Sequence, residues 1–227
     1  MSIHDGHRAR KKTQFREFGL DAFSDFEVLE LLLYYAVPRR DTSPIAHRLI
    51  ERFGSISGVL AASPEELEQV EGMGENAATL VSLLLPVCRR AYRSEARETG
   101  VILSSTERAG NYFCRIFQGL REEEFYQACL DAKGKLLSCT RIASGGTDSV
   151  SINMRSIVKT ALQVRASGVI LSHNHPSGVA LPSGDDNATT LMAYDALRTV
   201  GIELIDHIIV ADGDFVSLRD NGLLPPR

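Results

Sequence analysis

The sequence contains no tryptophan, no long apolar run and no Cys-x-x-Cys pair among its four cysteines. No stretch reaches the roughly 18 consecutive apolar residues that a transmembrane helix needs. The first residues, MSIHDGHRARKK, also lack the apolar core of a signal peptide. Scattered thiols without a metal-binding or disulfide spacing are typical of a reducing compartment. We therefore predict a cytoplasmic protein with no membrane partner.

An excess of positive charge is also missing, because 25 Lys and Arg are outnumbered by 29 Asp and Glu, for a net charge of −4. This balance argues against a uniformly basic nucleic-acid-binding protein, although a local basic patch would be enough for DNA. Low-complexity tracts are absent, and a hydrophobic content of 44% is ordinary for a globular protein. A chain of 227 residues can form two domains, each with its own core.

Signals for helix starts recur through the first hundred residues. A capping box at Ser24 precedes an apolar run that Pro38 ends, and Pro44 and Pro64 stand at the first turns of two further helices. Because each start signal is followed by apolar residues at helical spacing, we predict an all-α domain over residues 1–100.

Two segments of this half are expected to be irregular. Residues 7–16, HRARKKTQFR, contain five Lys and Arg side chains, which would attract phosphates if the segment were free. A solvated, frayed terminus is the simpler expectation. Residues 58–62 are expected to form a short turn between two helices.

Gly72 and Gly74 lie directly before a long apolar-periodic segment that begins at Glu75. Two glycines separated by one residue let the backbone turn sharply and present successive N–H groups at a helix start, where phosphate can bind. A tight turn that touches nothing fits the same pattern. The helical block resembles a helix-hairpin-helix module, which implies a possible non-specific contact with the DNA backbone. Such modules also mediate protein contacts.

Beyond residue 100 the pattern changes to strands alternating with helices. Residues 99–106 are expected to be a linker or an edge strand. The elements predicted after them are a helix over 106–119, a hairpin of strands 125–130 and 135–139, a loop at Ser144-Gly-Gly-Thr147, helices over 153–167 and 183–200, and strands over 169–173, 202–210 and 214–218. This order predicts an α/β layered domain over residues 101–227.

The stretch SHNHPSGVALPSGDD, residues 172–186, concentrates side chains that bind metals. His173 and His175 share one face of the predicted strand end. Asp186 would lie on the first turn of the helix that begins at Ser183. Two imidazoles and one carboxylate form a three-ligand set for zinc and leave a fourth position for water. Taken separately, Ser183-x-x-Asp186 also resembles a capping box, and His-x-His occurs by chance in many strands.

Hydrolysis at such a site also needs a base. A metal cation lowers the pKa of a bound water to roughly 7, and a carboxylate that does not bind the metal usually accepts the proton. Candidates are Glu122, Glu123 and Glu124 at the start of the first hairpin strand, and Asp185 beside the predicted ligand. A run of three acids is commonly a solvated strand end, so spacing alone does not decide between them.

The stretch HNHPSGVALPSGDD matches the pattern His-x-His, seven residues, Ser-x-x-Asp of the JAMM or MPN+ metalloprotease-like family. Nearly the whole chain resembles RadC proteins. The shared motifs are Phe53-Gly-Ser, Ser63-Pro-Glu-Glu-Leu, Gly72-x-Gly74, His173 to Gly178, Asp206-His207 and Phe215 to Leu218. The resemblance implies an α+β protein. Its N-terminal domain would be an all-α helix-hairpin-helix region, and its C-terminal domain an α/β/α JAMM domain, cytidine-deaminase-like, with a mixed sheet.

The same resemblance implies roles for individual residues. His173, His175 and Asp186 would hold zinc, Ser183 would help to stabilise the oxyanion, and a glutamate on the strand would be the general acid and base. Glu123 is chosen because it stands two positions before the first aromatic residue of the strand, and a one-residue slip would select Glu124. Where many relatives have His-Pro-Arg at the start of a helix, this chain has Asn153-Met154-Arg155, so only Arg155 carries over.

Three functions remain open from the sequence. The first is a zinc hydrolase that attacks a peptide, isopeptide or other amide carbonyl. The second is a nuclease or DNA-binding module associated with repair, and the third is an adaptor in which the zinc is structural. A zinc deaminase is set aside because the H-x-E and P-C-x-x-C signatures are missing. Asp206-His207 could orient a ligand imidazole, although a hydrogen-bonded core pair is the simpler expectation.

Overall fold

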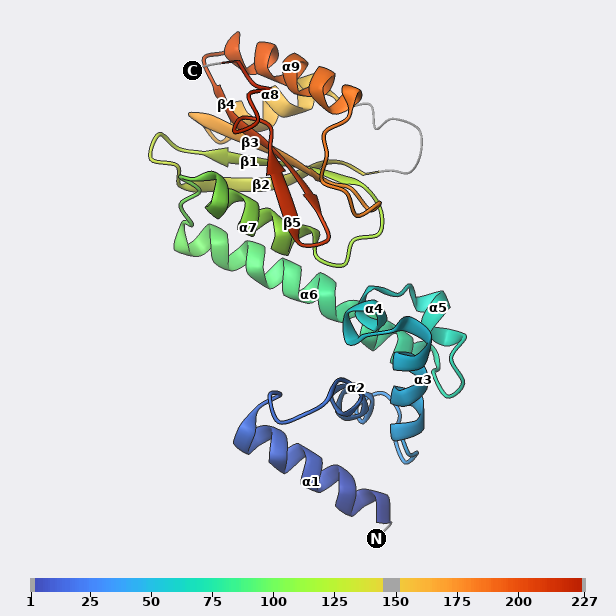
Figure 1. Cartoon of the computed structure of the whole chain (residues 1–227). Coiled ribbons are helices and arrows are strands. Elements are labelled where there is room, and N and C mark those ends of the chain that lie inside the picture. The colour runs from blue at the N-terminus through green and yellow to red at the C-terminus, as the bar shows by residue number, and fades with distance from the viewer. Residues whose placement is uncertain (1–2, 145–151, 226–227) are drawn as a thin grey trace. The chain divides into compact units, whose positions relative to one another are not determined.

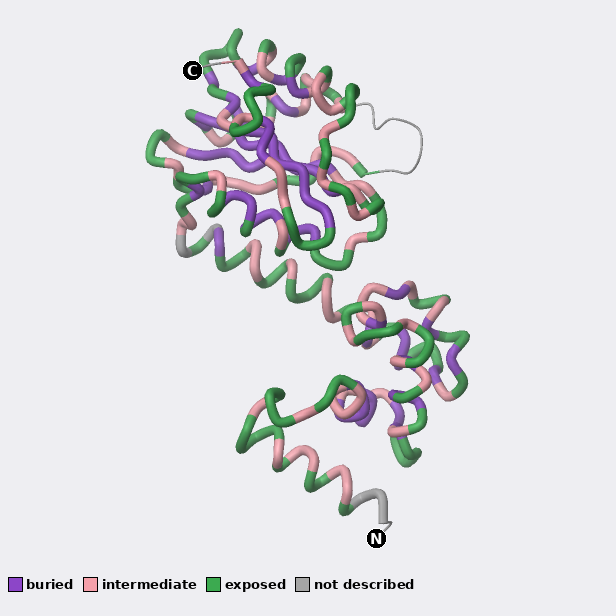
Figure 2. Tube along the Cα trace, in the orientation of Figure 1, coloured by how far each residue is buried: buried purple, intermediate pink, exposed green. Residues whose placement is uncertain are grey.

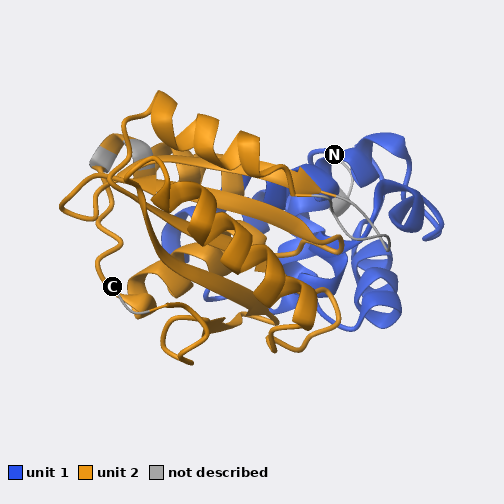
Figure 3. Ribbon diagram, turned by 90° about the horizontal axis from the view of Figure 1, so that it is seen from above, with its two compact units in different colours: residues 1–88 blue, residues 89–227 orange. Residues whose placement is uncertain are grey.

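The computed structural model describes residues 3–144 and 152–225, and the chain divides into two compact units, residues 1–88 and 89–227 (Figures 1 and 3). The division falls inside helix α6 (Glu75–Thr99) rather than at residue 100. Tyr92 and Ala96, in the second half of this helix, belong to the core of the second unit. The boundary between the units therefore lies at residue 88, before the predicted boundary at residue 100.

The first unit is entirely helical over its described residues, as the sequence predicts. It contains α1 (Ile3–Phe18), α2 (Asp25–Leu33), α3 (Ser43–Phe53), α4 (Ile56–Ala61), α5 (Pro64–Glu68) and the beginning of α6. Capping boxes start α2 at Ser24 and α5 at Ser63. Leu29, Leu49 and Leu67 are fully buried in the core that these helices share.

The N-terminal basic segment is helical, so the expectation of a frayed end at residues 7–16 is wrong. Helix α1 packs on α2, and several of its cations contact residues of the same unit. The guanidinium of Arg8 donates to the carbonyl oxygen of Val37 at 2.9 Å, Lys11 forms an ion pair with Glu27, and Lys12 lies over the ring of Tyr35. These contacts hold the helix and use three of the five positive charges, whereas Arg10 and Arg16 are exposed.

The expected turn at residues 58–62 is also wrong, because residues 56–61 form the short helix α4. Ser55 caps it by accepting a hydrogen bond from the Gly58 N–H at 3.1 Å. A Cβ atom at position 58 would lie 2.2 Å from the carbonyl oxygen of Phe53, so glycine is there for close packing of the backbone rather than for a turn.

The second unit is built on a five-stranded mixed sheet with the order β2-β1-β3-β4-β5. The strands are β1 (Glu124–Leu130), β2 (Leu136–Ser144), β3 (Gly168–Asn174), β4 (Glu203–Ala211) and β5 (Asp214–Ser217). Among them only β3 and β4 pair in parallel. Helix α7 (Thr106–Phe117) covers one face, and α8 (Met154–Gln163) and α9 (Gly184–Arg198) cover the other (Figure 1). The predicted α/β/α layering is confirmed.

Several element ends differ from the predicted ones. Strand β2 runs on to Ser144 because it pairs with the whole of β1, as far as Glu124. Helix α8 stops at Gln163, before the left-handed residue Arg165 (φ 55°). In the linker, Ile102 makes an isolated bridge to Lys135. Of the expected loop at residues 144–147, positions 145–147 lie outside the described residues.

The direction of the strands brings distant residues to one edge of the sheet. Strand β1 is antiparallel to β3, with Phe125 opposite His173, so the start of β1 meets the end of β3. Every residue of β3 is buried, and the strand lies in the middle of the sheet (Figure 2). Among the described helices, none is both long and apolar enough to cross a bilayer.

Candidate metal centre

Three side chains meet where strand β3 ends and helix α9 begins. Within the described part of the chain, His173, His175 and Asp186 form a group whose ligand atoms all lie within 4.8 Å of one another. His173 Nε2 lies 2.9 Å from His175 Nε2 and 3.0 Å from Asp186 Oδ1, and His175 Nε2 lies 3.5 Å from Asp186 Oδ2. The side chains named from the sequence are therefore brought together.

These separations suit a small cation. Tetrahedral zinc with bonds of about 2.0–2.1 Å places its ligand atoms roughly 3.3 Å apart, and the three observed distances lie around that value. Nδ1 of His175 lies 2.9 Å from the carbonyl oxygen of Val179, which can only accept a hydrogen bond. Nδ1 of a neutral His175 therefore carries the proton, and its Nε2 lone pair faces the other two ligands. The residues fit a metal ion.

His173 is held rigidly in the core. Its side chain is fully buried, and its ring stacks on that of Phe125, with 5.7 Å between the ring centroids. Nδ1 of His173 lies 2.9 Å from Nε2 of His207, on the neighbouring strand β4. His207 is also fully buried, and its Nδ1 lies 2.6 Å from Oγ1 of Thr190 in α9. A buried chain of polar groups thus continues behind the ligand.

The helix cap positions the third ligand. Ser183 and Asp186 form a capping box, in which the Asp186 N–H donates to Ser183 Oγ at 3.1 Å. In return, the backbone N–H and the hydroxyl of Ser183 both donate to Asp186 Oδ2, each at 2.7 Å. The cap and the cluster therefore share one carboxylate, whose other oxygen, Oδ1, faces His173.

Neighbouring charges and burial shift the pKa values of side chains in and behind the cluster. The hydrogen bond with Asp186 raises the pKa of His175 against the opposing effect of burial, and the negative charge of Glu123 contributes in the same direction. Burial disfavours the ionised form of Asp186, but its hydrogen bonds to His173 and His175 prevail and lower its pKa. Burial lowers the pKa of His207 well below the usual value, so this ring is neutral.

The glutamates at the start of β1 point in different directions. Glu124 is bonded to Arg141 at 2.7 Å and to the Tyr126 hydroxyl at 2.9 Å. Tyr126 belongs to the core beneath α7, whereas Phe125 faces the side that carries His173. Glu123 is half-buried, and its charge acts on His175. The exposed residues Glu122 and Asp185 are not in the cluster.

Asn174 fixes the segment that carries Glu123. Its side-chain oxygen accepts a hydrogen bond from the Glu124 N–H at 2.9 Å, and its amide nitrogen donates to the Glu122 carbonyl oxygen at 3.0 Å. Asn174 is only 4% exposed and stands between the two histidines in the sequence. The backbone on both sides of Glu123 is therefore tied to the end of the ligand-bearing strand.

Sequence reasoning missed Asn174 and Thr190 and undervalued His207. The expected buried, hydrogen-bonded pair is present only through the backbone, because Asp206 Oδ1 accepts from the His207 N–H at 2.7 Å. Alternation along β4 puts the two side chains on opposite faces. The Asp206 carboxylate accepts a hydrogen bond from Ser217 Oγ at 2.6 Å, while the His207 ring meets His173. Thr190 follows Asp186 by four residues, one helical turn, and that spacing was the available signal.

The two glycines of the predicted hairpin belong to the first unit. Gly72 has a φ of 94°, and a Cβ atom there would lie 2.8 Å from Ile45, so glycine is required by the fold. Gly74 precedes α6, and a Cβ atom there would meet nothing within 4 Å. The acidic residues Glu71 and Glu75 are both exposed beside it.

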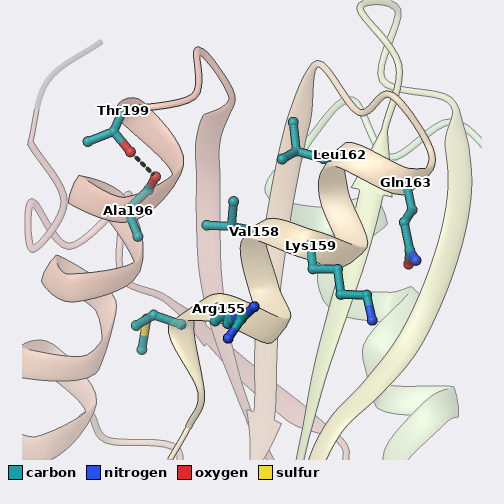
Figure 4. Close-up of a pocket in the computed structure, with 8 residues that line it drawn as sticks. Arg155, Val158, Lys159, Leu162, Gln163, Ala196 and Thr199 are labelled. Atoms are coloured by element: carbon teal, nitrogen blue, oxygen red, sulfur yellow. Dashed lines mark hydrogen bonds between the residues drawn. The ribbon is translucent and has the colours of Figure 1, made fainter.

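A groove between α8 and α9 is separate from this cluster (Figure 4). Apolar side chains such as Val158 and Leu162 line it, together with the cations Arg155 and Lys159. Asn153 caps α8 by accepting a hydrogen bond from the Arg155 N–H at 3.0 Å. Arg155, the residue that carries over from the family's helix-start motif, thus lies in the groove and not in the metal cluster.

A sheet with helices on both faces, and a His-x-His strand end that meets a helix-borne aspartate, define a domain of the JAB type. Comparison with known families agrees, because residues 103–223 match the family described as RadC-like JAB domain. The chain is also 33% identical, over 97% of its length and 98% of the relative's, to UPF0758 protein FN0909 of Fusobacterium nucleatum subsp. nucleatum. The chain belongs to the RadC family.

Proposed function

We propose that this protein is a zinc-dependent hydrolase that attacks an amide or isopeptide carbonyl. The observation that carries the proposal is the convergence of His173, His175 and Asp186 at separations of 2.9–3.5 Å, with the charge of Glu123, directly before β1, acting on His175. Two imidazole nitrogens and one carboxylate oxygen are the donor set of catalytic zinc sites, in which one position stays open for water. Family membership supports a hydrolase of this type.

A zinc ion held by these residues would supply Lewis-acid polarisation and a water molecule that is acidic near neutral pH. His173 and His175 would each contribute Nε2, and Asp186 would contribute Oδ1. The Glu123 carboxylate would accept the proton from the attacking water and deliver it to the leaving amine nitrogen. The Asn174 bonds to the flanking backbone would hold this glutamate in reach of the reacting atoms.

Ser183 would act as a donor to the developing oxyanion. In the structure its hydroxyl donates to Asp186 Oδ2, so the hydroxyl would have to rotate away from the aspartate when substrate binds. The Ser183 N–H also donates to Oδ2, which keeps the carboxylate oriented during that rotation.

Metal analysis of purified variants tests the ligand assignment. We expect one zinc per chain in the wild type, and none in His173→Ala or Asp186→Ala. Asp185→Ala is the matched control, because it removes the neighbouring exposed acid and should keep the zinc. A full complement of zinc in either ligand variant would overturn the assignment. Hydrolysis of a panel of fluorogenic peptide amides then tests the reaction class.

We keep DNA as an alternative partner, with a repair-associated binding module or nuclease as the corresponding function. The open space at Gly74 supports it, since a phosphate could approach the first N–H groups of α6. The carboxylates of Glu71 and Glu75 would weaken such a contact. Gly74→Asp keeps a good helix cap but places a negative charge where phosphate would bind, whereas Gly74→Ser keeps a neutral cap. Binding to duplex DNA should fall only in the aspartate variant. Equal binding by both variants would exclude the Gly72–Gly74 hairpin as a contact for DNA.

The proposed location is the cytoplasm. All four cysteines are free thiols, which suits a reducing compartment.

A further inference from the structure

We propose that His207 and Thr190 are positioning residues that fix the tautomer of His173 and keep its Nε2 lone pair directed at the metal. This inference rests on the proposed metal site and extends it to residues that do not touch the ion. Three hydrogen bonds carry it, and they connect β3, β4 and α9. A metal-binding imidazole commonly donates its other N–H to a protein acceptor that fixes its orientation, but here the acceptor is a second imidazole.

The donor and the acceptor of each hydrogen bond can be assigned by starting from Thr190, the residue in this series that is furthest from the metal site. Oγ1 of Thr190 lies 2.5 Å from the carbonyl oxygen of Asp186. Two oxygens approach so closely only when a proton lies between them, and a carbonyl has none to give. The hydroxyl therefore donates to the carbonyl, and towards His207 it can only accept.

The proton position on His207 then determines the proton position on His173, the proposed metal ligand. Nδ1 of His207, at 2.6 Å from Thr190 Oγ1, must carry a proton, so Nε2 of the neutral ring is an acceptor. Nδ1 of His173, at 2.9 Å from that acceptor, must in turn be the donor. In a neutral His173 ring the remaining nitrogen, Nε2, then has a free lone pair, and this nitrogen faces His175 and Asp186.

Burial prevents water from substituting for any of these hydrogen-bond partners. His173, His207 and Thr190 are each fully buried, so bulk water cannot replace a lost partner. If His173 carried its proton on Nε2 instead, two acceptor nitrogens would face each other behind the site and a donor would face the metal position. Both changes oppose metal binding.

The chain of bonds also returns to the site. It begins at the ligand His173 and ends on the backbone of the ligand Asp186, one turn before Thr190. The strand that provides the first ligand is thereby linked to the helix that provides the third. Loss of the Thr190 hydroxyl should loosen both ligands, although the residue contacts neither ligating atom.

Nitrogen NMR of histidine-labelled, metal-free protein tests the tautomers directly. We expect Nδ1 of His173 and Nδ1 of His207 both to carry a proton, with Nε2 of His207 unprotonated. An unprotonated Nδ1 on His173 in the wild type would overturn the proposal. This measurement uses neither metal nor substrate, so its result is valid even if the protein binds no zinc. In that case the proposed function fails, but the assignment of the proton positions does not.

A pair of threonine variants gives the second readout. Thr190→Val is nearly isosteric and removes only the hydroxyl, whereas Thr190→Ser keeps it. In a chelator competition assay we expect zinc affinity to fall roughly 10- to 100-fold in the valine variant and to stay within a few-fold in the serine variant. The nitrogen spectra should show mixed tautomers only in the valine variant. Wild-type affinity and tautomers in Thr190→Val would show that the threonine is merely structural.

Discussion

Nη1 of Arg141 lies 2.7 Å from Oε1 of Glu124, and the Tyr126 hydroxyl donates to the other oxygen of the same carboxylate at 2.9 Å. Both oxygens of Glu124 are thus bound on the α7 side of the sheet. Glu123 lies directly before β1, is half-buried, and its negative charge acts on His175. It is therefore the glutamate that we propose as the base.

The two glutamates should differ sharply when each loses its charge. We expect Glu123→Gln to keep zinc and to lower amide hydrolysis by roughly 10²- to 10⁴-fold, the usual contribution of a general acid and base. Glu124→Gln, the matched control, should retain turnover within a few-fold. Initial rates and zinc content of both variants provide the measurement. The opposite order of effects would transfer the role to Glu124.

Substitution of Asn174 should lower the rate of hydrolysis without releasing the metal. Asn174→Asp can still accept from the Glu124 N–H, but it cannot donate to the Glu122 carbonyl oxygen. Glu123 should then lose its position, and a small misplacement of a catalytic group costs about 10²-fold in rate. We expect kcat to fall with KM little changed and zinc retained. Ser177→Ala, on the exposed loop after His175, should leave kcat unchanged, and a wild-type kcat in Asn174→Asp would argue against this role.

The attachment of α1 should depend on pH. The hydrogen bond from Lys11, with those from Ser24, lowers the pKa of Glu27 from its ordinary value of 4.5 to about 2. A carboxyl group whose pKa is depressed by folding stabilises the folded state above its unfolded pKa, and this contribution is lost as pH falls from about 4.5 towards 2. The protection factors of the α1 amides, which correct the exchange rates for their intrinsic pH dependence, should fall across that window. In Glu27→Gln the exchange should already be fast at neutral pH, and an identical pH profile in this variant would exclude the ion pair as the anchor.

Gly72 should be intolerant of any side chain. Its φ of 94° is unfavourable for other residues, and a Cβ atom would lie 2.8 Å from Ile45. We expect Gly72→Ala to destabilise the first unit by roughly 1–3 kcal/mol. Thermal unfolding followed by circular dichroism measures the change. Gly74→Ser, where the added side chain meets nothing and the helix cap is kept, should remain within about 0.5 kcal/mol of the wild type.

A second glycine tests the packing of α7 on the sheet. A Cβ atom at Gly110 would lie 2.4 Å from ring atoms of Phe215, so the helix approaches β5 through this position. Gly110→Ala should cost about 1–3 kcal/mol by overpacking, in spite of alanine's better helix propensity. Gly184→Ala, in the first turn of α9 with open space around it, should be neutral or slightly stabilising. Equal melting temperatures for the two variants would contradict the close contact.

Local patterns were enough to predict the layers of the second unit and the grouping of the metal-binding side chains. His-x-His alternation puts two imidazoles on one strand face, and the Ser183 cap fixes the direction of the Asp186 side chain. Each of these relationships spans only a few residues. Similar local signals gave most helix starts in the first unit, but not α1, whose helix depends on partners such as Glu27 and Val37 in later segments.

The supporting contacts could not be predicted because they depend on which strands are neighbours. Asn174 bonds to backbone atoms some fifty residues earlier in the chain, and His207 reaches His173 only because β4 lies beside β3. No local pattern specifies these pairings. The division at residue 88 is of the same kind, since it follows from the packing of Tyr92 and Ala96 and not from a change in composition.

All three proposed ligands and both positioning residues lie within the single β3-α9-β4 crossover, whereas the proposed base, Glu123, lies directly before β1. Metal retention and proton transfer therefore depend on separate segments and can diverge independently. Under the proposed function, a relative that lacks only Glu123 should keep the fold and the metal while losing hydrolysis. Such relatives should be recognisable from this one position of their sequence.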